Sequence, residues 1–269
     1  MFIEVYIITG VIAFLFLVYL FLIAPRLRKR KFKLPEEGYA HRGLWNDERP
    51  ENSMAAFRAA VERGYGIETD VRLTHDGVPV LFHDDTLKRV CGDDRRVIDC
   101  TYEELKSARL SGSDEGIPTL SELLELAGGT VPLLIELKGE DLCTDLCPVI
   151  APMLEGYGDM ITVESFNPIL LSKMKKLMPK MPRGQLVTAL VSQGHPGNIF
   201  KNGILSCMML NFLSRPDFIA YNKDFPGGVS IFLCTRIFRA GRFVWTVKHR
   251  EEQEKFLKKG ITPIFEHRD

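Results

Sequence analysis

The segment Gly66-Ile67-Glu68-Thr69-Asp70-Val71 places two carboxylates two residues apart between apolar positions. This alternation predicts a β-strand, in which side chains two apart point to the same face. Glu68 and Asp70 then share one side, which is costly unless a cation or buried donors lie between them. A hard divalent cation meets this need, because Mg²⁺ and Ca²⁺ prefer oxygen ligands. The alternative is a half-buried strand whose acids face solvent.

Histidines flank this segment on both sides. Tyr39-Ala40-His41-Arg42-Gly43 precedes it and Leu81-Phe82-His83-Asp84 follows it, each joining an apolar run to an imidazole. Imidazoles suit general acid–base chemistry near neutral pH, although a lone histidine can equally be a hydrogen-bonded structural residue. Glu136 and Lys138 repeat the two-residue spacing farther along the chain. A lysine beside three carboxylates is either a structural ion pair or a neutraliser of phosphate charge.

Strand-like runs recur along most of the chain, separated largely by helix-capping signals. Thr101 with Glu104 and Thr119 with Glu122 read as capping boxes, and Asn167-Pro168 opens another helix. The length of this region fits one domain of the barrel size class. The expected strands lie near 38–42, 66–74, 79–83, 132–138, 161–166, 185–190, 217–221, 243–247 and 261–265.

These nine runs are one more than an eight-stranded barrel requires, and a hairpin accounts for the extra one. Asp76-Gly77 is a strong signal for a two-residue β-turn, so 78–83 should fold back on 66–75. With that loop Pro79 faces Thr74, and His83 falls opposite Asp70 on the same face of the sheet. A slip of one residue would turn His83 to the other face. The stretch from Asp85 to Ile117 is then an insertion over the barrel mouth.

Six short motifs resemble, in order and spacing, those of the glycerophosphodiester phosphodiesterase family. The resemblance runs from about Tyr39 to the C-terminus. It implies a (β/α)₈ TIM barrel, an α/β fold, with its site at the C-terminal ends of the strands. It also implies hydrolysis of glycerophosphodiesters to glycerol phosphate and an alcohol. The motifs are His41-Arg42-Gly43, Pro50-Glu51-Asn52-Ser53, Glu68-Thr69-Asp70-Val71, Asp76-Gly77, His83-Asp84 and Ile135-Glu136-Leu137-Lys138.

The resemblance assigns roles to the residues of these motifs. One histidine deprotonates the attacking hydroxyl, which can be the neighbouring hydroxyl of the glycerol itself. The other protonates the departing alcohol, and water later opens the cyclic phosphate. Trp245 either packs against the glycerol or belongs to the barrel core. The expected site is His41 and His83 for catalysis, Glu68, Asp70 and Glu136 for Mg²⁺ or Ca²⁺, Arg42, Lys138 and Trp245 for the substrate, and Glu51 and Asn52 as supporting residues.

Two positions depart from the family pattern. Lys248 follows Trp245-Thr246-Val247, where the family usually has Asn, and Phe265-Glu266 stands where it often has a Thr-Asp pair. We expect both departures to affect the rim that contacts the alcohol part of the substrate, and to leave the core chemistry unchanged.

The N-terminus predicts a membrane anchor. Val5 to Ala24 is twenty residues without a charge, about the length that crosses a hydrocarbon core of ~30 Å. A core helix of a soluble domain is the alternative, but such helices rarely lack a polar face over five turns. Only Glu4 precedes the run and six bases follow it by Lys33, which places the next domain in the cytoplasm by the positive-inside rule. We therefore expect an anchor at 1–25, a basic juxtamembrane linker at 26–37 and a catalytic domain at 38–269.

The remaining composition limits the partners. Of the 35 basic and 35 acidic residues, 29 bases and 34 acids remain from Leu34 onward, a net charge of −5. A basic stripe for nucleic acid is therefore not expected, and the partner is a small phosphodiester. The six cysteines show no secreted disulfide pattern, in agreement with a reducing compartment.

The sequence is compatible with two rival functions. One is a lysophospholipase-D-like or cyclising phosphodiesterase of lipid metabolism that acts on lysolipids, favoured by the anchor and by the apolar segment Ile199 to Leu213. The other is a membrane-tethered binding domain without catalysis, which the loss of a motif residue would favour. All of the motif residues are present.

Overall fold

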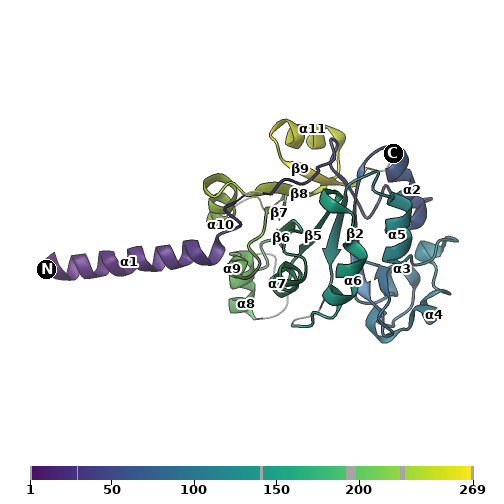
Figure 1. Ribbon diagram of the computed structural model, residues 1–269, viewed down its shortest axis with the longest axis horizontal. Helices are drawn as coiled ribbons and strands as arrows, with labels where there is room; N and C mark the ends of the chain where they lie inside the picture. The colour runs from purple at the N-terminus through teal and green to yellow at the C-terminus, as the bar shows by residue number, and fades with distance from the viewer. Residues whose placement is uncertain (1, 29, 140–141, 192–197, 225–227, 268–269) are drawn as a thin grey trace.

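Eight parallel strands close into a barrel in the computed structural model, which describes residues 2–28, 30–139, 142–191, 198–224 and 228–267. Strand β1 pairs with both β2 and β9, which closes the ring and confirms the predicted TIM barrel (Figure 1). Strand β6 begins two residues before the expected run. The strands are β1 (Tyr39–His41), β2 (Gly66–Leu73), β4 (Leu133–Leu137), β5 (Ile161–Ser165), β6 (Arg183–Val187), β7 (Phe218–Asn222), β8 (Gly241–Val247) and β9 (Thr262–Phe265).

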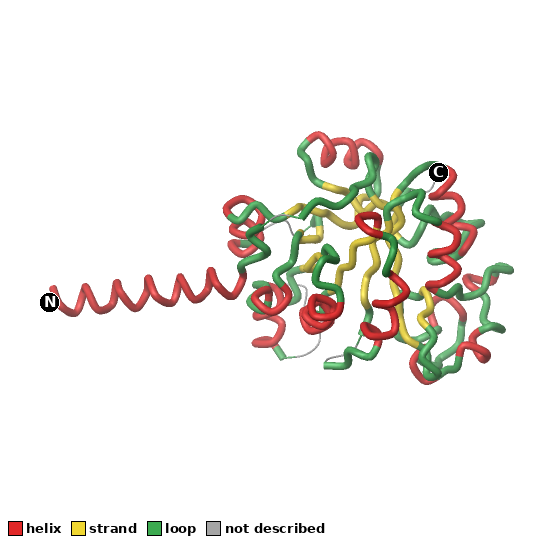
Figure 2. The backbone as a smooth tube through the Cα atoms, viewed as in Figure 1, coloured by secondary structure: helices red, strands yellow, loops and turns green. Residues whose placement is uncertain are grey.

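Helices surround the strands (Figure 2). Ser53 caps α2 by accepting the N–H of Ala56, and the predicted capping boxes at Thr101 and Thr119 are both present. Asn167 caps α7, which begins with Pro168 as expected. The outer helices are α2 (Met54–Glu62), α5 (Leu120–Ala127), α6 (Leu146–Leu154), α7 (Pro168–Leu177), α8 (Ile199–Ser206), α9 (Asn211–Ser214), α10 (Val229–Phe232) with the π-helical turn Leu233–Ile237, and α11 (Arg250–Lys258).

The barrel interior is apolar at one end and polar at the other. Tyr39, Phe218 and Phe243 pack together inside the barrel, with the rings of Phe218 and Phe243 stacked at 4.0 Å. Two residues farther along β1 and β8, the side chains on that face belong to His41 and Trp245. The alternation of side chains along the strands thus places the polar groups toward the C-terminal ends, next to the aromatic cluster.

The hairpin exists, but its register differs by one residue from the prediction. Strand β3 (Pro79–Leu81) pairs antiparallel with β2 so that Leu73 faces Pro79 and Val71 faces Leu81. The loop has three residues instead of two, with Gly77 at a φ of 80°. Three-residue hairpin loops commonly place such a left-handed residue last. Asp70 therefore stands opposite Phe82, whose N–H donates to the carbonyl of Asp70 at 3.0 Å.

The insertion after β3 forms a small core of its own. It contains α3 (Lys88–Cys91), α4 (Tyr102–Leu105) and the 3₁₀ turns Val97–Asp99 and Leu110–Gly112. Its apolar side chains pack against those of β3 and the residue after it, separately from the main core. They include Val80, Phe82, Leu87, Val97, Leu105 and Leu110.

Helix α1 (Phe2–Ile23) projects away from the barrel (Figure 1). It is the one helix among the described residues that is long and apolar enough, by length and composition, to cross a membrane. The segment after it runs along the barrel, where Arg26 and Arg30 both pair with Asp217. The ring of Phe32 packs on that of Phe218 at 5.9 Å.

Candidate active site

Three buried carboxylates converge from the middle of β2 and the C-terminal end of β4. Glu68, Asp70 and Glu136 are 1%, 0% and 7% exposed, and each offers an oxygen within 4.8 Å of the others. The parallel register places Asp70 beside Glu136 on the neighbouring strand. The spacing of Glu68 and Asp70 thus puts both on the inner face, and neither reaches solvent.

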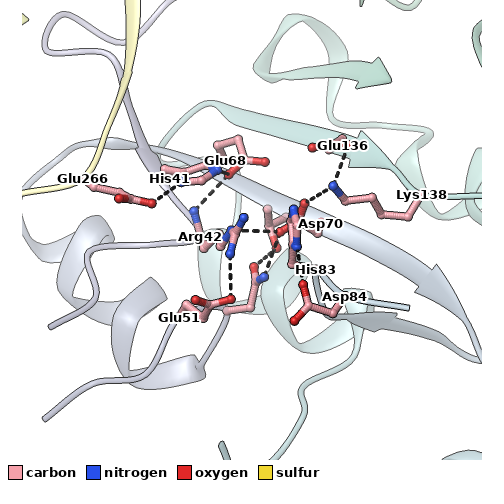
Figure 3. A network of polar contacts seen from close by, with 12 residues as sticks. His41, Arg42, Glu51, Glu68, Asp70, His83, Asp84, Glu136, Lys138 and Glu266 are labelled. Carbon is pink, nitrogen blue, oxygen red and sulfur yellow. Dashed lines mark hydrogen bonds and ion pairs between the residues drawn. The ribbon is translucent and has the colours of Figure 1, made fainter. Parts of the chain in front are cut away.

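Two cations are placed against this carboxylate cluster (Figure 3). Lys138 Nζ lies 3.0 Å from Asp70 Oδ1 and 2.7 Å from Glu136 Oε1. Arg42 has a φ of 59°, its backbone N–H donates to Glu68 Oε2 at 2.9 Å, and its Nε lies 3.5 Å from Asp70 Oδ2. Burial raises the pKa of Asp70, but Lys138 and Arg42 lower it by more, so this carboxyl stays ionised. Burial, with the charge of Asp70, raises the pKa of Glu68 well above its usual value.

A fourth acid, Glu164 on β5, was not expected from the sequence. It lies beside Glu136 in the strand register and is 1% exposed. Its Oε2 has no hydrogen-bond partner among the described residues, and burial raises its pKa well above its usual value. The alternation of Thr162 and Glu164 with buried apolar residues was the available signal in the sequence.

The charges of the site fit a divalent cation. Four buried carboxylates face Arg42 and Lys138, which leaves a formal charge of −2 if all four acids are ionised. Burial raises the pKa values of Glu68 and Glu164, and the neighbouring carboxylates raise them further. An oxygen-only donor set with this excess charge suits Mg²⁺ or Ca²⁺.

His41 is oriented by Glu266, a residue for which the sequence suggested only a place on the rim. His41 Nδ1 lies 2.6 Å from Glu266 Oε1, while Nε2 lies 3.8 Å from Glu68 Oε2 (Figure 3). Glu266 directly follows β9, whose pairing with β1 brings it beside His41. Glu266, one of the two departures from the family pattern, therefore contacts an expected catalytic residue.

His83 reaches the same cavity despite the shifted register. Strand β3 ends at Leu81, so the chain turns before His83 and the alternation no longer applies. Arg72 holds the turn by donating from Nε and Nη2 to the carbonyl of His83 at 3.0 and 2.9 Å. His83 Nδ1 lies 2.7 Å from Asp84 Oδ1, and burial lowers the pKa of His83 to about 4. The imidazole lines a cavity together with Glu68 and Glu136.

The expected supporting residues contact the site from behind. Asn52, with a φ of 53°, donates from Nδ2 to Asp70 Oδ2 at 3.0 Å and accepts from Thr69 Oγ1 at 2.8 Å. Glu51 accepts from Arg42 at 2.8 Å and from Arg89 at 2.6 Å. Because Arg89 lies on α3, Glu51 connects the insertion to the site.

An apolar cavity of about 460 Å³ adjoins the polar one. His83, Phe166, Leu186 and Trp245 line both. The ring of Trp245 meets that of Phe166 edge-on at 5.7 Å, and its indole N–H donates to the carbonyl of Ala220 at 3.2 Å. Trp245 is thus held at the boundary between the polar and the apolar cavity.

Known proteins resemble the chain over most of its length. Residues 41–268 match the Glycerophosphoryl diester phosphodiesterase family. A glycerophosphodiester phosphodiesterase of Caldanaerobacter subterraneus subsp. tengcongensis is 32% identical over 84% of this chain and 91% of its own. Glycerophosphodiester phosphodiesterase 1 of Bos taurus is 31% identical over 89% and 78%.

Solved structures agree with the sequence match. An Oleispira antarctica phosphodiesterase, in complex with the product sn-glycerol-3-phosphate, superposes with a TM-score of 0.69 at 27% identity, covering 85% of this chain and 91% of its own. A glycerophosphodiester phosphodiesterase from Parabacteroides distasonis gives a TM-score of 0.66 at 26% identity, over 86% and 91%. These matches confirm the resemblance carried by the six motifs: the chain belongs to the glycerophosphoryl diester phosphodiesterase family and is an enzyme of that class.

Proposed function

We propose that this enzyme hydrolyses glycerophosphodiesters with a divalent metal ion and with His41 and His83 as its acid–base pair. The observation that carries the proposal is the convergence of Glu68, Asp70 and Glu136 within 4.8 Å, beside both imidazoles. The product named for the Oleispira antarctica phosphodiesterase, sn-glycerol-3-phosphate, supports a glycerol phosphate product here.

The three carboxylates would hold Mg²⁺ or Ca²⁺, which would supply Lewis-acid polarisation of the phosphoryl oxygens. Arg42 and Lys138 add positive charge on the protein side. Lys138 contributes a compact point charge, whereas the Arg42 guanidinium can clamp a phosphate oxygen. Glu51 keeps the Arg42 side chain in place for this contact.

The histidines are arranged to move protons at their Nε2 atoms. Each Nδ1 is engaged by a carboxylate, Glu266 for His41 and Asp84 for His83, which leaves Nε2 for the substrate. Burial lowers the pKa of His83 to about 4, so the imidazole is neutral at physiological pH and has a lone pair free to accept the proton of the attacking hydroxyl. His41 would then protonate the departing alcohol as the P–O bond breaks.

A metal-dependence assay against a panel of glycerophosphodiesters tests the proposal. Enzyme treated with a chelator should lose turnover of glycerophosphocholine, glycerophosphoethanolamine and glycerophosphoglycerol. Adding back Mg²⁺ or Ca²⁺ should restore it, with glycerol phosphate and the free alcohol as products. Full activity in the chelated enzyme would contradict the metal requirement.

A second candidate substrate class is the lysophospholipids, with lysophospholipase-D-like or cyclising chemistry. The apolar cavity favours it, because Val187, Leu190 and Leu205 extend the site away from the carboxylates. Its volume lies in the range of small-molecule pockets, about 300–1,000 Å³. Product analysis on glycerophosphocholine and lysophosphatidylcholine separates the two classes. Leu205→Trp should slow only the lysolipid if the cavity holds its chain.

We also propose that the enzyme is anchored in a membrane. Residues 1–25 would form a single-pass anchor, 26–37 a juxtamembrane segment and 38–269 the catalytic domain on the cytoplasmic side. The length and apolar composition of α1 support the anchor, and the bases after Ala24 support the orientation.

A further inference from the structure

The end of α1 is packed into the barrel domain. Tyr19 Oη lies 2.6 Å from Ser230 Oγ on α10. The carbonyl of Ile23 accepts hydrogen bonds from Asn211 Nδ2 at 2.9 Å and from Cys234 Sγ at 3.2 Å. Figure 1 shows α9 and α10 beside this end of the helix. The domain therefore meets α1 along its side as well as at its end.

Arg215 fixes the same junction. Its Nη1 donates to the carbonyls of Phe21 and Ala24, both at 2.9 Å, and its guanidinium stacks over the Phe21 ring at 4.7 Å. The last carbonyls of a helix are left without intrahelical partners, and a cation there also offsets the helix dipole. These contacts hold the end of α1 against the barrel.

The position of Tyr19 sets the depth of the domain. The uncharged stretch from Val5 to Ala24 would be about 30 Å long as a helix, close to the hydrocarbon thickness. Tyr19 precedes Ala24 by five residues, about 7 Å along the axis. If Ala24 lies at the edge of the hydrocarbon, a domain that touches the helix at Tyr19 enters the membrane by about that depth, within the ~5–10 Å reached by interfacial helices.

The side chains at this level suit such an environment. Val229 and Phe232, on either side of Ser230 in α10, are 67% and 57% exposed. Nearer the helix end, a cavity of about 550 Å³ is lined by apolar residues, Phe21 among them, and by four cationic side chains. Its cations are Arg26, Arg28, Lys175 and Arg215. Apolar groups thus lie deeper and positive groups shallower, the order in which a leaflet presents its acyl chains and phosphates.

We propose that the catalytic domain is docked on the lipid bilayer, with Val229 and Phe232 among the acyl chains and the four cations of this cavity level with the lipid phosphates. The proposal rests on the membrane anchor proposed above and adds a second contact with the same leaflet. The partner is an anionic phospholipid surface. Docking fixes the orientation of the barrel relative to that surface.

Depth-dependent quenching of tryptophan fluorescence tests this in the full-length protein. The chain is reconstituted in vesicles of phosphatidylcholine and phosphatidylglycerol, with and without bromine atoms on the acyl chains. Phe232→Trp reports on α10, and Val229→Trp repeats the measurement at a second position. Phe14→Trp in α1 is the control for the anchor, and Ile98→Trp, an exposed apolar position in the insertion, is the control for a site in water. The native Trp45 and Trp245 give the background.

Brominated lipid is expected to remove most of the emission added by Phe14→Trp, Phe232→Trp and Val229→Trp, and to leave that of Ile98→Trp unchanged. Quenching of Phe14→Trp without quenching at either α10 position would overturn the docking and keep the anchor. An absence of quenching in Phe14→Trp would contradict both the membrane anchor and the docking. Turnover of glycerophosphocholine by each variant shows that the barrel is folded, and is read separately from the quenching.

Discussion

Replacing Glu266 by Gln should slow catalysis while leaving substrate binding nearly unchanged. The carboxylate is the partner of His41 Nδ1 at 2.6 Å, and the other ring nitrogen faces Glu68. Burial raises the pKa of Glu266, but the hydrogen bond and charge of His41 lower it by more, so the group is ionised at neutral pH. The substitution removes that charge at nearly constant shape.

The magnitude follows from the loss of one hydrogen bond to a charged group. Such a bond contributes about 1.5–3 kcal/mol, and each 1.36 kcal/mol of barrier is a factor of ten in rate. If the full effect falls on the transition state, kcat should drop by about 10- to 150-fold. Glu266→Ala should fall at the upper end of this range, and Glu266→Asp, which keeps the charge, should retain more activity.

The assay is steady-state turnover of glycerophosphocholine, with kcat and KM determined separately. Glu254→Gln is the matched control, because Glu254 pairs with Lys258 on the exposed face of α11. Its kinetics should match those of the parent enzyme. A rise in KM with kcat unchanged in Glu266→Gln would refute the reasoning, since it would identify Glu266 as a rim residue that only binds the alcohol.

Three further outcomes are expected. Glu136→Gln should abolish divalent-metal binding and activity with the fold intact, and tight stoichiometric metal binding to that variant by calorimetry would rule out the carboxylate site. Protease added to intact cells should leave the catalytic domain whole. Digestion without permeabilisation would show that the domain faces the outside of the cell. Burial raises the pKa of Glu51, but Arg89 and Arg42 lower it below 4.5, so its contribution to stability is present above about pH 4.5 and is lost as the pH falls through the lower folded value. Arg89→Gln should therefore lower the free energy of unfolding by up to about 1 kcal/mol at neutral pH, as Arg89 is half-exposed. It should also reduce the loss of stability in acid, measured by urea unfolding. An unchanged loss in acid would contradict the assignment.

Local signals predicted most of the fold. All nine strands appear near the expected runs, and the helix starts at Ser53, Thr119 and Asn167 carry the expected caps. These features depend on residues a few positions apart, which the sequence displays directly. The strand alternation also predicted the inner face shared by Glu68 and Asp70.

The hairpin register could not be obtained in the same way. Thr74 Oγ1 donates to Asp76 and accepts the N–H of Val78 at 2.9 Å, which stabilises a loop one residue longer than the Asp-Gly pair alone suggests. The prediction that His83 pairs opposite Asp70 was therefore wrong. His83 nevertheless reaches the cavity, because the strand ends at Leu81 and Arg72 holds the following turn.

The site residues that the sequence did not predict are brought to the site by pairing between distant strands. Glu266 meets His41 through the closure of β9 on β1, and Glu164 meets Glu136 through the register of β4 and β5. Local periodicity carries no information about which strands become neighbours. Their contacts could be read only once the barrel order was known.

The closure of the barrel through its first and last strands has a consequence for biosynthesis. His41 and Glu266 are 225 residues apart in the chain, and β1 cannot complete its pairing until β9 has been made. At a translation rate of about 5–20 residues per second, the first strand waits about 10–45 s for its last partner. Helix α1 is synthesised before any strand, so a membrane could receive it while the barrel is still open. Hydrolytic activity would then be the last property that the nascent chain acquires.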